Sequence, residues 1–188
     1  MKQLSIVVGV GGAGCYIAEK IGNAHNCEVV AINDSHSTLT DKKAHHKLNL
    51  NLENSNGRIP TPEQLVMAAN SISSNFQQLI QHKQKAIIVV GLGGNTGTNV
   101  APVLAKIAKE HNKSITIVAT LPFDFESQRQ AIADTALLKL KADFNNIIIH
   151  DHSARNNSEK SLQISLEDYF AEVADQLAAE YEPHIVLC

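Results

Sequence analysis

The 188-residue chain is long enough for one domain with a sizeable buried core, and its 44% hydrophobic and 19% charged residues are typical of a globular protein. The net charge of −3 provides no basic field for a nucleic-acid backbone, and 4% aromatic residues without any Trp disfavour a platform for stacked bases. No apolar run approaches the roughly 20 residues that span a bilayer, and no signal-peptide pattern precedes the first apolar run, so we expect a cytoplasmic protein.

Short apolar runs alternate with longer segments of helical period along the chain. In chain order we predict a strand over residues 4–8, a glycine-rich loop over 9–14 and then a helix to about residue 25, a strand over 28–32, a short helix within 37–44, a loop over 48–62 and a helix over 62–83. There follow a strand over 86–90, a glycine-rich loop over 91–99, a helix over 100–111, a strand over 114–120, a helix over 127–142, a strand over 146–149, a polar loop over 150–160 and a helix over 166–181. The strands are continuously apolar, as in sheets that helices cover on both faces. The pattern predicts a single domain over residues 1–188 with a three-layer α/β fold and a doubly wound, mostly parallel sheet.

A first glycine-rich loop joins the first predicted strand to its helix. Residues 9–14 read Gly-Val-Gly-Gly-Ala-Gly, which satisfies G-x-G-x-x-G at Gly9, Gly11 and Gly14. Glycines let the backbone approach a phosphate, and the following helix offers free N–H groups and a positive dipole end. The motif by itself is also compatible with a tight turn that holds no ligand.

A second glycine-rich loop follows the predicted strand over residues 86–90. Residues 91–99 read Gly-Leu-Gly-Gly-Asn-Thr-Gly-Thr-Asn. Gly93, Gly94 and Gly97 free the backbone to wrap an anion, and Thr96 and Thr98 add hydroxyl donors. In an open α/β sheet both loops lie at the carboxyl edge, where ligands bind. Two such loops can hold one polyphosphate from both sides, which a dinucleotide site does not need.

Four motifs, in order, resemble those of the tubulin/FtsZ family. Residues 91–102 resemble the tubulin signature as FtsZ proteins carry it, G-x-G-G-G-T-G-T-G-A-A-P, with Asn95 and Asn99 in place of two glycines. Residues 9–14 resemble the first FtsZ phosphate loop, and residues 122–126 resemble its P-F-x-F-E motif. Residues 169–177 resemble the start of the central helix, and Asn33 matches the Asn that ends the second strand.

The resemblance implies a role for each candidate residue. Gly11, Gly12, Ala13, Gly14 and Cys15 would line the α/β-phosphates, whereas Gly93, Gly94, Asn95, Thr96, Gly97 and Thr98 would cradle the β/γ-phosphates. Glu126 would accept a hydrogen bond from the ribose, Arg129 would reach a phosphate or the ribose, Phe170 would cover the base and Asp175 would bind the N1–H and amino group of guanine. The family's Arg lies one position later, where this chain has Gln130, and the family's Asn before the Asp is Ala174 here.

The resemblance therefore predicts GTP or GDP as the ligand, with Mg²⁺ as an expected companion of the phosphates. No N-x-D-x-x-D motif follows residue 181, so we expect the family's acidic catalytic loop and C-terminal domain to be missing and hydrolysis to be weak or dependent on a partner. Self-association, or binding to a full-length FtsZ-like protein, would fit such a chain. Two other readings stay open. One is an NAD(P)-binding Rossmann protein that uses the first loop and Asn33 or Asp34; the other is a ligand-free scaffold for a partner protein.

Overall fold

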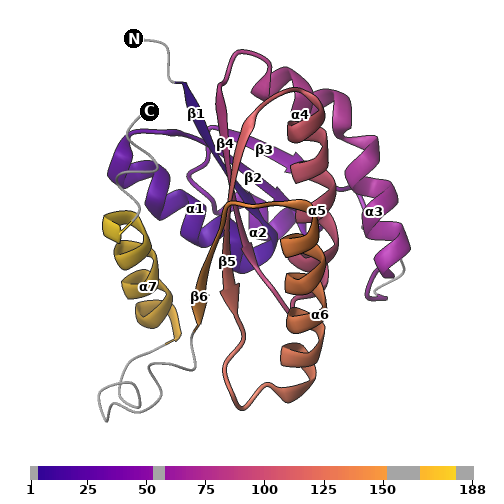
Figure 1. Ribbon diagram of the computed structural model, residues 1–188, viewed down its shortest axis with the longest axis vertical. Coiled ribbons are helices and arrows are strands. Elements are labelled where there is room, and N and C mark those ends of the chain that lie inside the picture. The colour runs from indigo at the N-terminus through magenta and orange to yellow at the C-terminus, as the bar shows by residue number, and fades with distance from the viewer. Residues whose placement is uncertain (1–3, 53–57, 152–165, 181–188) are drawn as a thin grey trace.

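Six parallel strands form one sheet at the centre of the computed structural model, which describes residues 4–52, 58–151 and 166–180 (Figure 1). The strands are β1 (Ser5–Val10), β2 (Glu28–Asn33), β3 (His46–Asn49), β4 (Lys85–Gly91), β5 (Ser114–Leu121) and β6 (Ile147–Asp151). Their order across the sheet is β3-β2-β1-β4-β5-β6, and every pairing is parallel. The predicted doubly wound α/β fold is confirmed.

Helices cover both faces of the sheet. They are α1 (Gly11–His25), α2 (His36–Thr40), α3 (Pro62–Ser71), α4 (Ser73–Ile80), α5 (Asn95–Glu110), α6 (Ser127–Asp143) and α7 (Leu166–Glu180). In Figure 1, α1 and α7 lie on one side of the sheet, and α3, α4, α5 and α6 lie on the other. Because successive side chains of a strand point to opposite faces, Val7 packs with the α1–α7 layer whereas Ile6 and Val8 pack with the α5 layer. In the described part of the chain, no helix is both long and apolar enough to cross a membrane.

Three sequence-based boundaries are wrong. The prediction missed β3, which overlaps the start of the predicted loop over residues 48–62. It is a four-residue edge strand whose half-exposed side chains give no apolar signal. The predicted helix over residues 62–83 is two helices that meet at Ile72, whose backbone lies near φ −90° and ψ 3°. Both glycine-rich loops turn into helix earlier than predicted, at Gly11 and at Asn95, so most of their residues form first helical turns.

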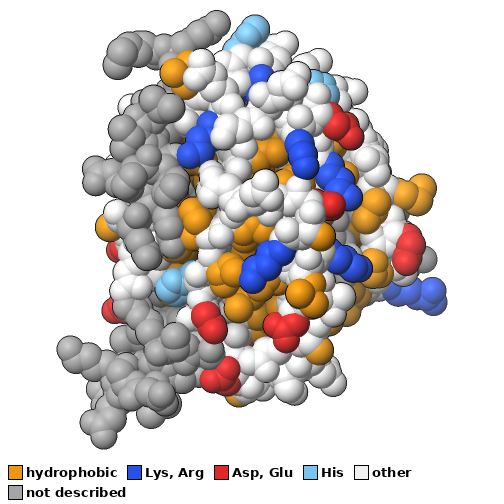
Figure 2. All heavy atoms as spheres, viewed as in Figure 1, with side chains coloured by type: hydrophobic (Ala, Val, Ile, Leu, Met, Phe, Trp, Pro, Cys, Tyr) orange, Lys and Arg blue, Asp and Glu red, His pale blue; other side chains and the backbone are white. Residues whose placement is uncertain are grey.

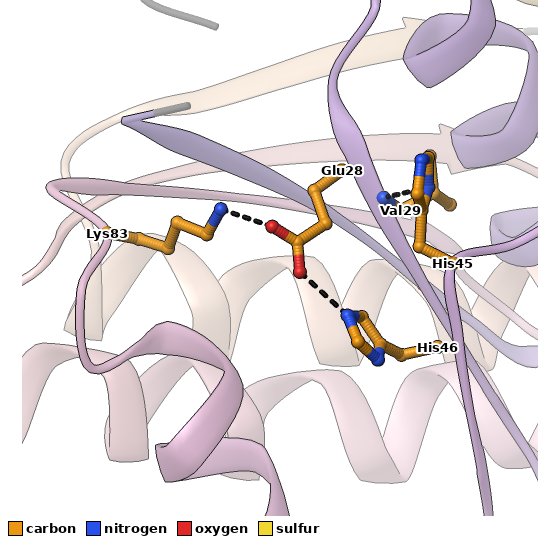
Figure 3. Close-up of polar contacts among 5 residues, drawn as sticks. All are labelled: Glu28, Val29, His45, His46 and Lys83. Carbon is orange, nitrogen blue, oxygen red and sulfur yellow. Dashed lines mark hydrogen bonds and ion pairs between the residues drawn. The ribbon is translucent and has the colours of Figure 1, made fainter. Parts of the chain in front are cut away.

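A charged cluster at the amino edge of the sheet joins β2, β3 and the turn that precedes β4 (Figure 3). The Glu28 carboxylate accepts hydrogen bonds from Lys83 Nζ and from His46 Nε2, the latter at 2.7 Å. Partial burial alone would raise the pKa of Glu28, but these two hydrogen bonds outweigh it and hold that pKa below its usual value of 4.5. Beside them, the backbone N–H of Val29 donates to His45 Nδ1 at 3.1 Å. The cluster fixes β3, an otherwise weakly held edge strand, to the body of the sheet.

Candidate functional site

The two glycine-rich segments meet at the point where the strand order reverses. Strands β1 and β4 are neighbours, and the chain leaves them toward opposite faces of the sheet, through α1 and α5. Crevices of this kind are the usual ligand sites of open α/β sheets. The two loops touch each other: a Cβ atom on Gly11, whose φ is +75°, would lie 3.0 Å from the backbone N of Gly97. Only glycine allows both this backbone conformation and this approach.

Both helices begin without a side-chain cap. The N-cap residues Val10 and Gly94 make no side-chain capping bond, and neither helix has an acidic residue in its first turn. The first N–H groups of a helix have no partner within it, and the helix dipole adds positive potential at that end. Two such ends therefore face the same crevice, which is the electrostatic arrangement that binds an anion.

A cavity of about 290 Å³, which we call the switch-point cavity, lies between these helix ends. It is lined by Val10, Gly11, Gly12, Ala13, Gly91, Leu92, Gly94, Asn95, Thr96, Gly97, Thr120, Leu121, Pro122, Phe123, Glu126 and Arg129. Nine of the sixteen predicted site residues are thus brought together. Gly12 is the most open of the glycines, because a Cβ atom there would meet no heavy atom within 4 Å.

Two residues that were predicted to line the α/β-phosphates, Gly14 and Cys15, pack against the sheet and do not line the cavity. A Cβ atom on Gly14 would lie 2.4 Å from the Val89 carbonyl oxygen, so Gly14 allows α1 to sit tightly on β4. Cys15 is buried, and its Sγ donates to the carbonyl oxygens of Gly9 and Ile32 at 3.3 and 3.4 Å. Burial raises the pKa of the Cys15 thiol to about 12, so the thiol stays protonated.

The second segment is shaped by its own side chains. The Gly93 N–H donates to Thr98 Oγ1 at 2.9 Å, and Gly93 has φ +86°. Thr96 Oγ1 donates to Asp34 Oδ1 at 2.6 Å and so links the start of α5 to the end of β2. Gly93 and Thr98 therefore shape the loop behind the cavity wall, while Thr96 lines the cavity itself.

Glu126 and Arg129 form one side of the cavity at the start of α6. The Glu126 carboxylate accepts from Arg129 Nη1 at 2.7 Å and from the Phe123 N–H at 3.2 Å. Phe123 stacks on Phe125 with ring centroids 5.2 Å apart, and Phe125 is 75% exposed. Sequence reasoning recognised the motif over residues 122–126 and named Glu126 and Arg129 as site residues, but it did not include the wall that follows β5, Thr120 to Phe123, among them. Its signal was available, because that stretch follows a parallel strand at the same sheet edge.

Of three further predicted site residues, two do not line the switch-point cavity, and the side chain of the third is outside the described part of the chain. Asn33 ends β2 and is 5% exposed, with its backbone carbonyl accepting from Leu50 N at 3.0 Å. Asp175 is exposed on α7, the helix that packs against α1. Phe170 belongs to α7, but its side chain is outside the described part of the chain. In Figure 1, α7 runs opposite to the strands and begins near their carboxyl edge.

A second hollow, of about 700 Å³, lies between α5 and α6. Its lining includes Val66, Val103, Ile132 and Leu140, together with Lys106 and Lys139. Figure 2 shows hydrophobic side chains gathered over these helices, with Lys or Arg side chains beside them. No helix begins in this lining, so the hollow lacks the free helix N–H groups that face the switch-point cavity.

Comparison with known proteins decides the family. The model of the "Tubulin/FtsZ family, GTPase domain" matches residues 5–160. The chain belongs to the tubulin/FtsZ family. Cell division protein FtsZ of Aquifex aeolicus (strain VF5) is 32% identical, with 92% of this chain and 48% of that protein aligned. FtsZ of Rickettsia felis is 30% identical, over 79% of this chain and 34% of that protein. This family member thus spans half or less of the length of these curated relatives.

Solved structures of the tubulin/FtsZ family share its fold. An empty FtsZ dimer from M. jannaschii has a TM-score of 0.82 and 27% identity, covering 98% of this chain and 55% of that one. TubZ of Clostridium botulinum phage c-st has a TM-score of 0.74 at 18% identity, covering 97% of this chain and 60% of that one, and shows the fold alone. The chain thus has the FtsZ-type nucleotide-binding fold.

Proposed function

We propose that the switch-point cavity binds GTP or GDP through the phosphates. One observation carries the proposal: two helices, α1 and α5, begin uncapped at the same cavity, and the chain belongs to a family whose matching model describes a GTPase domain. We assign the phosphate oxygens to the exposed, unobstructed Gly12 and to the backbone of α5 at Asn95, Thr96 and Gly97, all of which line the cavity.

The proposed phosphate position also indicates which residues contact the ribose and the base. With the phosphates at the helix ends, we assign the ribose to Glu126, which lines the cavity, and the guanine base to Asp175 and Phe170 of α7. Among the described residues, no group of three or more His, Cys, Asp or Glu side chains is arranged to hold a metal ion. Mg²⁺ would therefore be held mainly by the phosphates and water, as is usual for this ion.

We propose further that hydrolysis by this chain is weak or depends on a partner. Phosphoryl transfer requires a group that positions the attacking water. Within the described residues, Glu126 is the one carboxylate that lines the switch-point cavity, and it already accepts from Arg129 and from the Phe123 N–H. In this proposal, a second subunit or a full-length FtsZ-like protein supplies the group that positions the water.

Self-association is the related proposal for the rim of the cavity. Phe125 is 75% exposed beside Glu126, and Ile59 is 81% exposed beside Pro60, whose carbonyl oxygen accepts from the cavity residue Asn95. Two large apolar side chains at the rim favour a protein that covers the site. The structural relative from M. jannaschii is described as a dimer, which supports this direction.

Isothermal titration of the purified, nucleotide-free chain with GTP, GDP, ATP and NAD⁺ tests the binding proposal. We expect binding of GTP and GDP, at least tenfold tighter than that of ATP or NAD⁺, or about 1.4 kcal/mol. Preference for NAD⁺ would favour the Rossmann reading, and no binding of any nucleotide would favour the ligand-free scaffold. Either result would refute the proposal.

A variant pair locates the site. Gly12→Leu places a side chain in the cavity without meeting other protein atoms near its Cβ, so GTP affinity should fall at least tenfold. Ala24→Leu makes a similar addition at an exposed position on the same helix and serves as the control. Equal GTP affinity of the two variants would place the ligand elsewhere.

A further inference from the structure

Asn95 occupies a position where the tubulin signature has glycine, and its side chain is bonded to the protein. Its Nδ2 donates to the Pro60 carbonyl oxygen at 2.7 Å, across 35 residues of sequence. Asn99 supports it from the next turn of α5: Asn99 Nδ2 donates to the Asn95 carbonyl at 2.7 Å and lies 3.4 Å from Asn95 Oδ1. Glycine at position 95 has no side chain with which to reach Pro60. The link therefore depends on the asparagine that distinguishes this chain.

The residues around Pro60 form a stiff stretch, residues 58–61, which we call the proline segment. Pro60 and Pro62 flank Thr61, and each proline fixes its own φ and holds the preceding residue extended. Thr61 is extended, at φ −73° and ψ 159°. It also forms a capping box with Gln64: Thr61 Oγ1 accepts from Gln64 N at 3.3 Å, and Gln64 Oε1 accepts from Thr61 N at 2.9 Å. One end of the proline segment is thus fixed to α3.

A stiff segment with one fixed end needs few further contacts to be placed. The Asn95 bond supplies such a contact, and it joins the segment to the first residue of α5, which lines the switch-point cavity. The bond is made entirely within the protein and requires no phosphate. The segment carries Ile59, 81% exposed, so its placement also sets where this apolar side chain stands at the rim.

We propose that Asn95 is a positioning residue that orders the proline segment in the nucleotide-free protein, so that this segment does not respond to whether GTP or GDP fills the cavity. A ligand shifts a conformational equilibrium only by its different affinity for the two states, and a segment already held leaves little to shift. The second half of this statement rests on the proposed nucleotide binding, whereas the first half does not.

Hydrogen exchange read by mass spectrometry over residues 58–65 tests the first half without any ligand. In Asn95→Ala we expect exchange about fivefold faster than in the wild type, the factor that corresponds to a hydrogen bond of about 1 kcal/mol. Asn70→Ala is the matched control, because Asn70 lies on α3 and its Nδ2 bonds the Val66 carbonyl instead. It should leave these peptides unchanged.

Asn95→Asp keeps the proposal testable if the alanine variant does not fold. The side chain keeps its size and loses its donor, and a carboxylate in a first helical turn is favourable. Exchange should again be faster, and wild-type exchange rates in whichever of the two variants folds would overturn the role of Asn95.

The nucleotide arm adds saturating GTP or GDP to the wild type. Each should alter exchange of the proline segment by less than about twofold. Strong protection by GTP and not by GDP would overturn the second half. Absence of binding by either nucleotide would refute the proposed function and with it the second half, while the nucleotide-free comparison still decides the role of Asn95.

Discussion

Substituting two neighbouring glycines by alanine should have opposite effects on stability. Gly11 has φ +75°, a conformation that costs a residue with a Cβ atom about 1–2 kcal/mol. Its Cβ would also lie 3.0 Å from Gly97 N, so the two helix starts would have to separate. We expect Gly11→Ala to lose about 2 kcal/mol, which lowers Tm by about 4–8 °C in a chain of this size.

Gly12→Ala is the internal comparison. Its Cβ would meet nothing within 4 Å, and alanine is favoured over glycine in a helix by up to about 1 kcal/mol. Stability should stay equal or rise slightly. Thermal and urea unfolding of the nucleotide-free proteins measure both changes, without any stabilisation by bound ligand. If Gly12→Ala were the more destabilised of the two, the described contact between the glycine-rich segments would be incorrect.

Three further predictions concern single side chains. Glu28→Gln should destabilise the protein by about 1–2 kcal/mol at pH 7. Because the folded-state pKa of Glu28 lies below its usual value of 4.5, the wild-type advantage is present above that pH and should shrink as pH falls through the lowered pKa. In urea titrations, a wild-type advantage that does not shrink as pH is lowered below 4.5 would contradict the cluster in Figure 3. Cys15, with its pKa raised to about 12, should resist iodoacetamide at pH 8 in the folded protein and react after unfolding. Site-resolved mass spectrometry measures the labelling, and labelling of Cys15 in the folded protein would contradict its burial. Asp175→Ala should reduce GTP affinity about tenfold or more and leave ATP affinity unchanged in the same titration. Because Asp175 is exposed, Tm should stay within about 2 °C of the wild type, and an equal loss of affinity for both nucleotides would show that Asp175 is not the guanine contact.

The central strands could be predicted because burial on both faces requires apolar residues at every position. All six residues of β1 are buried, and β4 is buried over five of its seven. Strand β3 could not be found this way, because an edge strand is held by backbone pairing to β2 and carries half-exposed side chains. The helix starts at Gly11 and Asn95 were missed because glycine and asparagine propensities favour loops, and tertiary packing overrides them.

The site was predictable in its location but not in its detailed contacts. The loops follow parallel strands, and that alone places them at one edge. The family resemblance implied that Cys15 lies beside the ligand, but the helical turn that starts at Gly11 carries its Sγ inward, toward the Ile32 carbonyl. The bond from Thr96 to Asp34 joins the start of α5 to the residue after β2, 62 positions away, and no local pattern predicts such a contact.

The reversal of strand order also constrains how the molecule is assembled. Strand β1 pairs with β4, joining residues about 80 positions apart, and parallel pairings of such separation form slowly. On the ribosome, β1, β2 and α1 emerge well before β4, so the nascent chain carries one half of the cleft without its counterpart. A ligand that needs both halves cannot stabilise an early folding intermediate. It stabilises only chains in which β1 and β4 have already paired.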